Sequence, residues 1–260
     1  MIIDSHTHVH PSTTGFGRNR DATPDTFLNE LAASPVDIAV LLPIEPIITT
    51  EFACSVAARD PKKILCYGSV DPTLGLPAVE RLEQLFGAHT LYGLKLHPRW
   101  QKITKDHWPT VFELVRQAAK RGRPTIIDCF AYGKGALRDD SLELIEATAE
   151  AVPEAKLIIA HMGGTRILDA LILARTSYTI YLDLSLILSV YRGSHLEQDI
   201  FYAIRRIGAD RCLYGSDFPE VGMSTSLTDM KTALVARGFS DDEMEWIFHK
   251  TAAHVLGLSK

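Results

Sequence analysis

The sequence predicts an α/β protein, a single-domain (β/α)8 TIM barrel over residues 1–260. Short runs rich in Val, Ile, Leu and Tyr recur eight times along the chain. Stretches with helical periodicity lie between these runs, and no low-complexity tract or Pro/Gly/Ser linker divides the chain. Strand followed by helix, repeated eight times in a chain of this size, is typical of the barrel.

The eight expected strands are short and nearly continuous in apolar residues, as strands covered on both faces are. They cover residues 1–6, 37–42, 64–70, 91–96, 125–129, 156–161, 179–184 and 211–216. An open doubly wound sheet would carry a Gly-rich phosphate-binding turn after its first strand. The turn after residue 6 has no such pattern, which favours the barrel.

Helical periodicity is clearest in residues 106–120, where apolar side chains from Val111 to Ala118 fall on one stripe after an acidic start. Residues 141–151 and 195–207 show the same pattern. These segments are expected to be the helices that cover the outside of the barrel.

Composition excludes several classes of function. A net charge of −5 without a basic block makes nucleic acid and anionic membranes unexpected partners. Apolar runs such as residues 38–44 are too short to span a bilayer. The 4 cysteines form no Cys-x-x-Cys pair, so we expect reduced thiols in a cytoplasmic protein. The expected partner is a small molecule, and a homo-oligomer stays open.

Polar side chains collect at the carboxyl ends of the expected strands, where barrels place their active residues. They are His6, His8, Lys95, His97, Asp128, His161, Asp183, Ser185 and Asp217. Alternate residues of a strand share one face, so Asp4, His6 and His8 are expected to point the same way. Imidazole is the commonest metal ligand, and the clustering favours a metal site over a merely imidazole-rich terminus.

Four segments resemble the amidohydrolase superfamily, in the right order along the whole chain. They are DSHTH at residues 4–8, KLIIAHMGG at 156–164, CLYGSDFP at 212–219 and HKTAAHVLGL at 249–258. The most similar branch is the amidohydrolase-2 group, which includes the aminocarboxymuconate-semialdehyde decarboxylase-like enzymes. The resemblance implies a metal-dependent barrel that hydrolyses amides, esters and lactones or decarboxylates aromatic and unsaturated acids.

The resemblance also implies roles for residues. His6 and His8 match the metal ligands of the first strand, and Asp217 matches an aspartate that binds the metal or handles the proton of its water. His161 matches a histidine that acts as acid or base beside the metal. Asp128 departs from the pattern, because the family usually has a metal-binding histidine there. A carboxylate can replace an imidazole, with a shift in preference towards manganese, or Asp128 can serve as a local hydrogen-bond acceptor.

The segment GLKLHPR, residues 93–99, alternates cationic side chains. Lys95, His97 and Arg99 are therefore predicted to bind a carboxylate of the substrate. Two alternatives stay open: a carboxylated Lys95 that bridges two metals, as in some branches of the superfamily, and a buried Lys95 that pairs with Asp128 or Asp217.

Together these observations predict a hydrolase with one divalent metal, zinc with manganese as the alternative, bound by His6, His8 and Asp217, with Asp128 or His161 completing the set. Asp217 and His161 are the expected catalytic residues. The expected substrate is a small carboxylated lactone, ester or amide. The alternatives are a non-oxidative decarboxylase and a non-catalytic ligand-binding barrel with a weakened metal site.

Overall fold

The computed structural model describes residues 1–13, 20–133 and 136–258, and in these ranges the chain has eight parallel strands. They are β1 (Ile3–Thr7), β2 (Ile38–Leu41), β3 (Ile64–Cys66), β4 (Leu94–Leu96), β5 (Thr125–Ile127), β6 (Leu157–Ile159), β7 (Ile180–Asp183) and β8 (Cys212–Leu213). Each lies inside or nearly inside a predicted run. Six of the eight predicted runs, all but those of β1 and β4, extend too far at their carboxyl ends, because those residues leave the ladder and form the loops of the site.

The strands form two parallel sheets, β1-β2-β3 and β4-β5-β6-β7-β8. Isolated bridges join the sheets at both seams. Gly68, beyond β3, pairs with Leu94 of β4, and Thr7 of β1 pairs with Phe218, beyond β8. The sheets therefore surround a common axis, and the predicted (β/α)8 barrel is confirmed.

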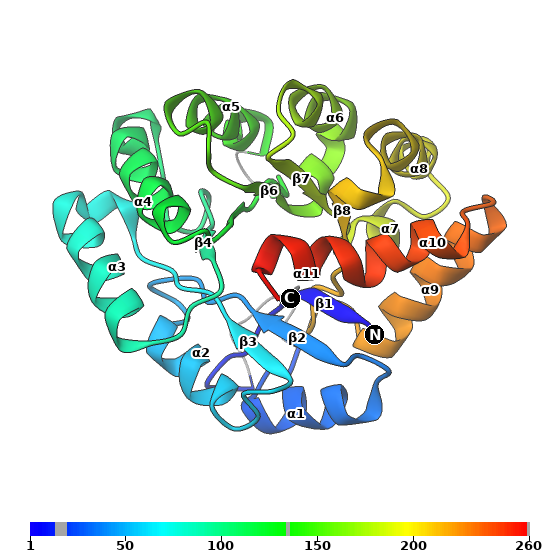
Figure 1. Ribbon diagram of the computed structural model, residues 1–260, viewed down its shortest axis with the longest axis horizontal. Coiled ribbons are helices and arrows are strands. Elements are labelled where there is room, and N and C mark those ends of the chain that lie inside the picture. Colours follow the sequence, from blue (N-terminus) through cyan, green and yellow to red (C-terminus); the bar gives the residue numbers. More distant parts are fainter. Residues whose placement is uncertain (14–19, 134–135, 259–260) are drawn as a thin grey trace.

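Helices form a ring around the strands (Figure 1). The α-helices are α1 (Pro24–Ala33), α2 (Thr50–Ala57), α3 (Leu76–Ala88), α4 (Trp108–Lys120), α5 (Ser141–Ala151), α6 (Ile167–Thr176), α7 (Ile187–Tyr191), α8 (His195–Ile207), α9 (Met223–Ala236), α10 (Asp241–Glu245) and α11 (Thr251–Leu256). Shorter helical turns are η1 (Pro72–Leu74), η2 (Lys105–His107), η3 (Ala136–Arg138), η4 (Ala160–Arg166), η5 (Ala209–Arg211) and the π-helical η6 (Trp246–Lys250). Within the described ranges, none of the helices is long and apolar enough to cross a membrane.

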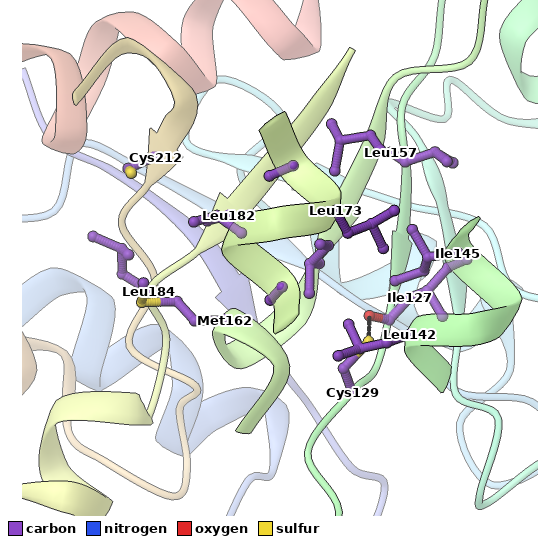
Figure 2. Packing of buried hydrophobic residues seen from close by; sticks show 14 of the residues in the cluster. Ile127, Cys129, Leu142, Ile145, Leu157, Met162, Leu173, Leu182, Leu184 and Cys212 are labelled. Carbon is purple, nitrogen blue, oxygen red and sulfur yellow. Dashed lines mark hydrogen bonds between the residues drawn. The ribbon is translucent and has the colours of Figure 1, made fainter. Parts of the chain in front are cut away.

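Side chains of each strand alternate between two buried clusters. In β5–β7, Ile126, Ile158 and Tyr181 belong to the cluster inside the barrel and are neighbours in register. Their sequence neighbours pack outward against the helices, and Figure 2 shows Ile127 beside Leu142 and Cys129 in this outer layer. The alternation explains the nearly continuous apolar character of the strands.

Helix α11 closes the amino end of the barrel. Ala252, Val255 and Leu256 belong to the same buried cluster as the interior strand residues. Arg123, just before β5, donates a hydrogen bond to the carbonyl of Leu256 over 3.1 Å. Figure 1 shows α11 across the centre of the ring of helices. With this end filled, polar groups can gather only towards the carboxyl ends of the strands.

Candidate metal and catalytic site

A bulge in β1 sets the direction of its histidines. Asp4 pairs with Ala39, and three residues later Thr7 pairs with Leu41, so strict alternation is broken between them. The prediction that Asp4 shares a face with His6 is therefore wrong. The Asp4 carboxylate instead accepts hydrogen bonds from the backbone N–H groups of Ser216, over 2.8 Å, and of His6, over 3.3 Å.

His6 and His8 are both held through their Nδ1 atoms. His6 Nδ1 lies 2.8 Å from Asp183 Oδ2, and His8 Nδ1 lies 2.7 Å from the carbonyl of Leu42. The carbonyl can only accept, so His8 carries its proton on Nδ1 and offers the lone pair of Nε2. His6 Nε2 is buried and has no hydrogen-bond partner among the described residues. Burial lowers the pKa of His6 to about 4, which keeps this imidazole neutral.

Asp217 reaches these histidines across the seam between β8 and β1. Its backbone N–H donates to the carbonyl of His6 over 2.9 Å, and its φ of 61° lies in the left-handed region. Its Oδ1 lies 3.4 Å from His8 Nε2 and 3.5 Å from His6 Nε2. Burial raises the pKa of Asp217, but the neighbouring His8, His161 and His6 outweigh burial and hold the pKa below its usual value. Strained backbone of this kind persists where the surroundings impose it, often at active sites.

His161 follows β6 and also has a left-handed backbone, with φ of 53°. Its Nδ1 lies 3.1 Å from the carbonyl of Ser185 and 2.9 Å from the Ser185 hydroxyl, while its Nε2 lies 3.2 Å from Asp128 Oδ2. Burial disfavours the imidazolium, but Asp128, Asp217 and Asp183 outweigh it and raise the pKa of His161 to about 9. In this arrangement Nδ1 and Nε2 of His161 both face oxygen acceptors.

Asp183, the last residue of β7, and Ser185, two residues further on, connect the two halves of the site. Asp183 Oδ2 contacts His6 Nδ1 and accepts from the backbone N–H of His161 over 3.2 Å. The Ser185 hydroxyl donates to Asp183 and lies 3.0 Å from His6 Nδ1. Sequence reasoning placed both residues at a strand end but assigned them no role. Their position two residues apart after an apolar strand was the only available signal.

Three side chains converge closely enough to hold a metal ion. In the part of the chain that the structure describes, His6, His161 and Asp217 each offer a ligand atom within 4.8 Å of the other two. Imidazole nitrogen with carboxylate oxygen is a donor set that suits zinc. The unpartnered, buried Nε2 of the neutral His6 also fits a metal ligand. His8 adjoins the group through Asp217, and so the residues present fit a divalent cation.

Asp128 lies between three nitrogen bases beside this group. Its Oδ2 is 3.2 Å from His161 Nε2, 3.6 Å from His97 Nε2 and 3.9 Å from Lys95 Nζ. Burial raises the pKa of Asp128, yet the neighbours, His97 first, outweigh burial and hold the pKa well below its usual range. Its Oδ1 accepts from the N–H of Phe130 over 3.2 Å, so the local acceptor role considered from the sequence is present. The ligand role of Asp128 stays a prediction.

Three residues were predicted to bind a carboxylate, namely Lys95, His97 and Arg99, and each has a different environment in the structure. Lys95 is fully buried inside the barrel, in register with Ile126, and pairs with Asp128. His97 stacks on Trp100 with ring centroids 4.6 Å apart, and burial lowers its pKa to about 3. The Arg99 guanidinium lies 3.7 Å from the centre of the Tyr132 ring and donates to the Tyr132 carbonyl over 2.7 Å.

A cavity of about 400 Å³ opens beside these groups at the carboxyl ends of the strands. Its polar lining comprises His8, His97, Asp128, His161, Asp217 and Glu220, and its aromatic lining Trp100, Phe130, Tyr132 and Tyr191. Of the predicted carboxylate-binding residues, only His97 is among the described residues that line it. This volume accommodates a small organic molecule, with the candidate metal site on its wall.

The family model of the amidohydrolase-2 family, which is described as amidohydrolase, matches residues 3–258 of the chain. The chain therefore belongs to the amidohydrolase-2 family, as its four motifs suggested. Members of this family are metal-dependent enzymes, and they include hydrolases and decarboxylases. No curated protein sequence matches the chain.

Solved structures show the same fold at low sequence identity. An uncharacterized TIM-barrel protein from Bordetella bronchiseptica has a TM-score of 0.76 and 18% identity, covering 98% of both chains. A probable 2-pyrone-4,6-dicarboxylic acid hydrolase from Acinetobacter baumannii, with citric acid bound, has a TM-score of 0.72 and 14% identity, covering 98% of this chain and 99% of its own. A dihydroxybenzoic acid decarboxylase from Polaromonas, with manganese and 2-nitroresorcinol bound, has a TM-score of 0.70 and 16% identity, covering 100% of this chain and 97% of its own.

Proposed function

We propose that this protein is a metal-dependent hydrolase that cleaves a small carboxylated lactone, ester or amide. The observation that supports this best is the position of Asp217. Its carboxylate lies on the cavity wall, between the Nε2 atoms of His6 and His8 at 3.5 and 3.4 Å. A carboxylate of lowered pKa, beside ligands for a cation and open to a cavity, is placed to accept a proton from water.

In this proposal His6, His8 and Asp217 hold the cation, zinc first and manganese as the alternative. When bound, a divalent cation supplies Lewis acidity towards a carbonyl oxygen and towards water. His6 and His8 suit the task because each is fixed through Nδ1 and offers Nε2. His161 also belongs to the close group with His6 and Asp217, but in this proposal it is left as a proton donor, because its Nε2 faces Asp128 Oδ2 over 3.2 Å.

The side chains then divide the proton transfers between them. Asp217 takes a proton from the attacking water and delivers it to the leaving oxygen or nitrogen. His161, on the cavity wall, donates a hydrogen bond to the oxygen on which negative charge develops. Asp183 and Ser185 hold the imidazoles of His6 and His161 in place throughout.

A carboxylate on a bound substrate would lie beside His161 and the cation at the cavity wall. His97 lines the cavity but burial keeps it uncharged, and Arg99 would have to leave Tyr132 to reach a ligand. The Acinetobacter protein is a probable hydrolase of a dicarboxylic acid, which supports an acidic substrate only by analogy.

The test is an assay of the metal-loaded protein on carboxylated lactones and esters. A pH-stat measures the acid that the reaction releases. Hydrolysis should consume one water and release acid without carbon dioxide. Asp217→Asn should lower kcat at least ~100-fold, because the general base is lost. Exposed Asp169 of α6, paired with Arg166 of η4, offers the matched control Asp169→Asn, which should keep wild-type turnover.

Decarboxylation of an aromatic acid is the second candidate, and one contact favours it. The Phe130 ring packs edge-on against His161 with centroids 5.5 Å apart, so a flat ring in the cavity would lie beside a protonated imidazole. Carbon dioxide release without water consumption would identify this reaction. A protein that binds no metal and turns over neither substrate class would instead be a non-catalytic barrel.

A further inference from the structure

Two thiols meet outside the candidate site, between the helix layer and the barrel. Cys54 belongs to α2 and Cys66 is the last residue of β3. Their Sγ atoms are 3.4 Å apart, although the residues are 12 positions apart in the chain. Neither residue takes part in the proposed reaction.

The environments of the two thiols differ. Cys54 is half-buried, whereas Cys66 is 3% exposed. The hydrogen bond between them lowers the pKa of Cys54 and raises the pKa of Cys66, and burial raises the latter further. Oxidants in the solvent can therefore reach Cys54 first, and Cys54 is also the better thiolate.

The other two cysteines lack these properties. Cys129 and Cys212 are buried, and burial raises the pKa of both. Among the contacts of the described residues, the sulfur of Cys129 meets the carbonyl of Ile127 and that of Cys212 meets the carbonyl of Gly208. Oxidation of the folded protein should therefore be selective for the α2–β3 pair.

We propose that Cys54 and Cys66 form a modification site, at which a hydroperoxide oxidises the two thiols to an intramolecular disulfide. The Cys54 sulfur attacks the outer peroxide oxygen, the O–O bond breaks, and the thiol proton leaves with the resulting alcohol or water. Cys54 is then a sulfenic acid. Cys66 attacks its sulfur, the S–S bond forms, and the hydroxyl leaves as water with the Cys66 proton. The dithiol loses two electrons, and the peroxide gains them.

The local structure allows the bond with little movement. A disulfide joins sulfurs at about 2.0 Å, so the two atoms must approach by about 1.4 Å. The proposal requires the half-buried Cys54 side chain to rotate so that its sulfur moves towards Cys66. Helix α2 is already fixed here, since Thr50 Oγ1 donates to the Ser69 carbonyl and accepts from its N–H, both over 2.9 Å.

The experiment treats the native, metal-loaded protein with hydrogen peroxide and counts thiols after denaturation. The 4 thiols of the chain should fall to two, dithiothreitol should restore them, and peptide mapping should link Cys54 to Cys66. Cys66→Ser should stop at a sulfenic acid on Cys54 that dimedone captures. Cys54→Ser should keep its remaining thiols, and the matched control Cys129→Ser should still form the disulfide.

Two outcomes would overturn the proposal. One is retention of all 4 thiols at a peroxide concentration that oxidises free cysteine in the same buffer. The other is loss of thiols in Cys54→Ser at the wild-type rate, which would place the reactive sulfur elsewhere. Thermal melts of each variant show that the thiols are compared in folded proteins.

Discussion

Asp183 contacts several residues of the site, although the sequence analysis assigned it no role. One carboxylate holds the ring of His6, the backbone of His161 and the hydroxyl of Ser185. A carboxylate on Nδ1 fixes the proton there and leaves Nε2 as the free lone pair of His6. The orientation of the metal-facing nitrogen therefore depends on a residue that does not line the cavity.

Asp183→Asn should weaken metal binding by about 10–100-fold, because the amide keeps the shape of the side chain but not its charge. Affinity for zinc can be measured by competition with a fluorescent chelator. Asp169→Asn, which alters an exposed carboxylate, serves as the control. Wild-type affinity in Asp183→Asn would show that Asp183 acts only on the fold.

At this scale the sequence identified the residues whose position is set locally. His6, His8, His161 and Asp217 stand at strand ends, and all four reach the site. The partner of Asp183 lies 177 positions away, so no local pattern could reveal that contact. Asp4 was misplaced because a bulge shifts the strand by one residue, and alternation assumes that no bulge is present.

Elements with strong periodicity were predicted almost to the residue. Helices α5 and α8 have the expected bounds, and α4 begins at Trp108 because the turn Lys105–His107 precedes it. Strand ends were predicted less well. After Ile127 and Leu213 the chain leaves the ladder to form loops, a tertiary effect that apolar composition does not record.

The loop after β8 also contains a glycine that the site requires. A Cβ on Gly215 would lie 2.7 Å from the His6 Cβ and 3.0 Å from the Ser185 Cβ. Gly215→Ala should therefore displace His6 and lower metal affinity strongly, as a competitive chelator titration would show. Gly87→Ala in α3 meets nothing within 4 Å and should leave affinity unchanged. Equal affinity in both variants would contradict this packing.

At the scale of the whole molecule, the site lies across a seam. His6 belongs to β1 of the sheet β1-β2-β3 and His8 directly follows β1, whereas His161 and Asp217 follow strands of the other sheet. The eight strand–helix repeats and the lack of a Gly-rich turn after the first strand predicted the barrel. They could not predict that it divides into sheets of three and five strands, because that depends on where ladder hydrogen bonds give way to isolated bridges.

An ion held by both sheets should stabilise the barrel as a whole. At a metal concentration near 100 times Kd, binding to the native state alone adds about 2.7 kcal/mol. Chelation should then lower Tm by about 5 °C or more for a chain of this size. Scanning calorimetry with and without chelator measures the difference. His6→Ala with His8→Ala should melt at one temperature under both conditions, and a chelator effect of wild-type size in that variant would place the ion elsewhere.

The helix that fills the amino end of the barrel limits the routes by which a ligand can reach or leave the cavity. In the described part of the chain, α11 and the interior side chains occupy the far end of the axis, so the cavity faces one way. In the proposed reaction, substrate and products would use the same opening of this cavity, whose lining includes the rings of Trp100 and Tyr132. A product of that reaction would have to leave before the next substrate enters, so product release would contribute to kcat.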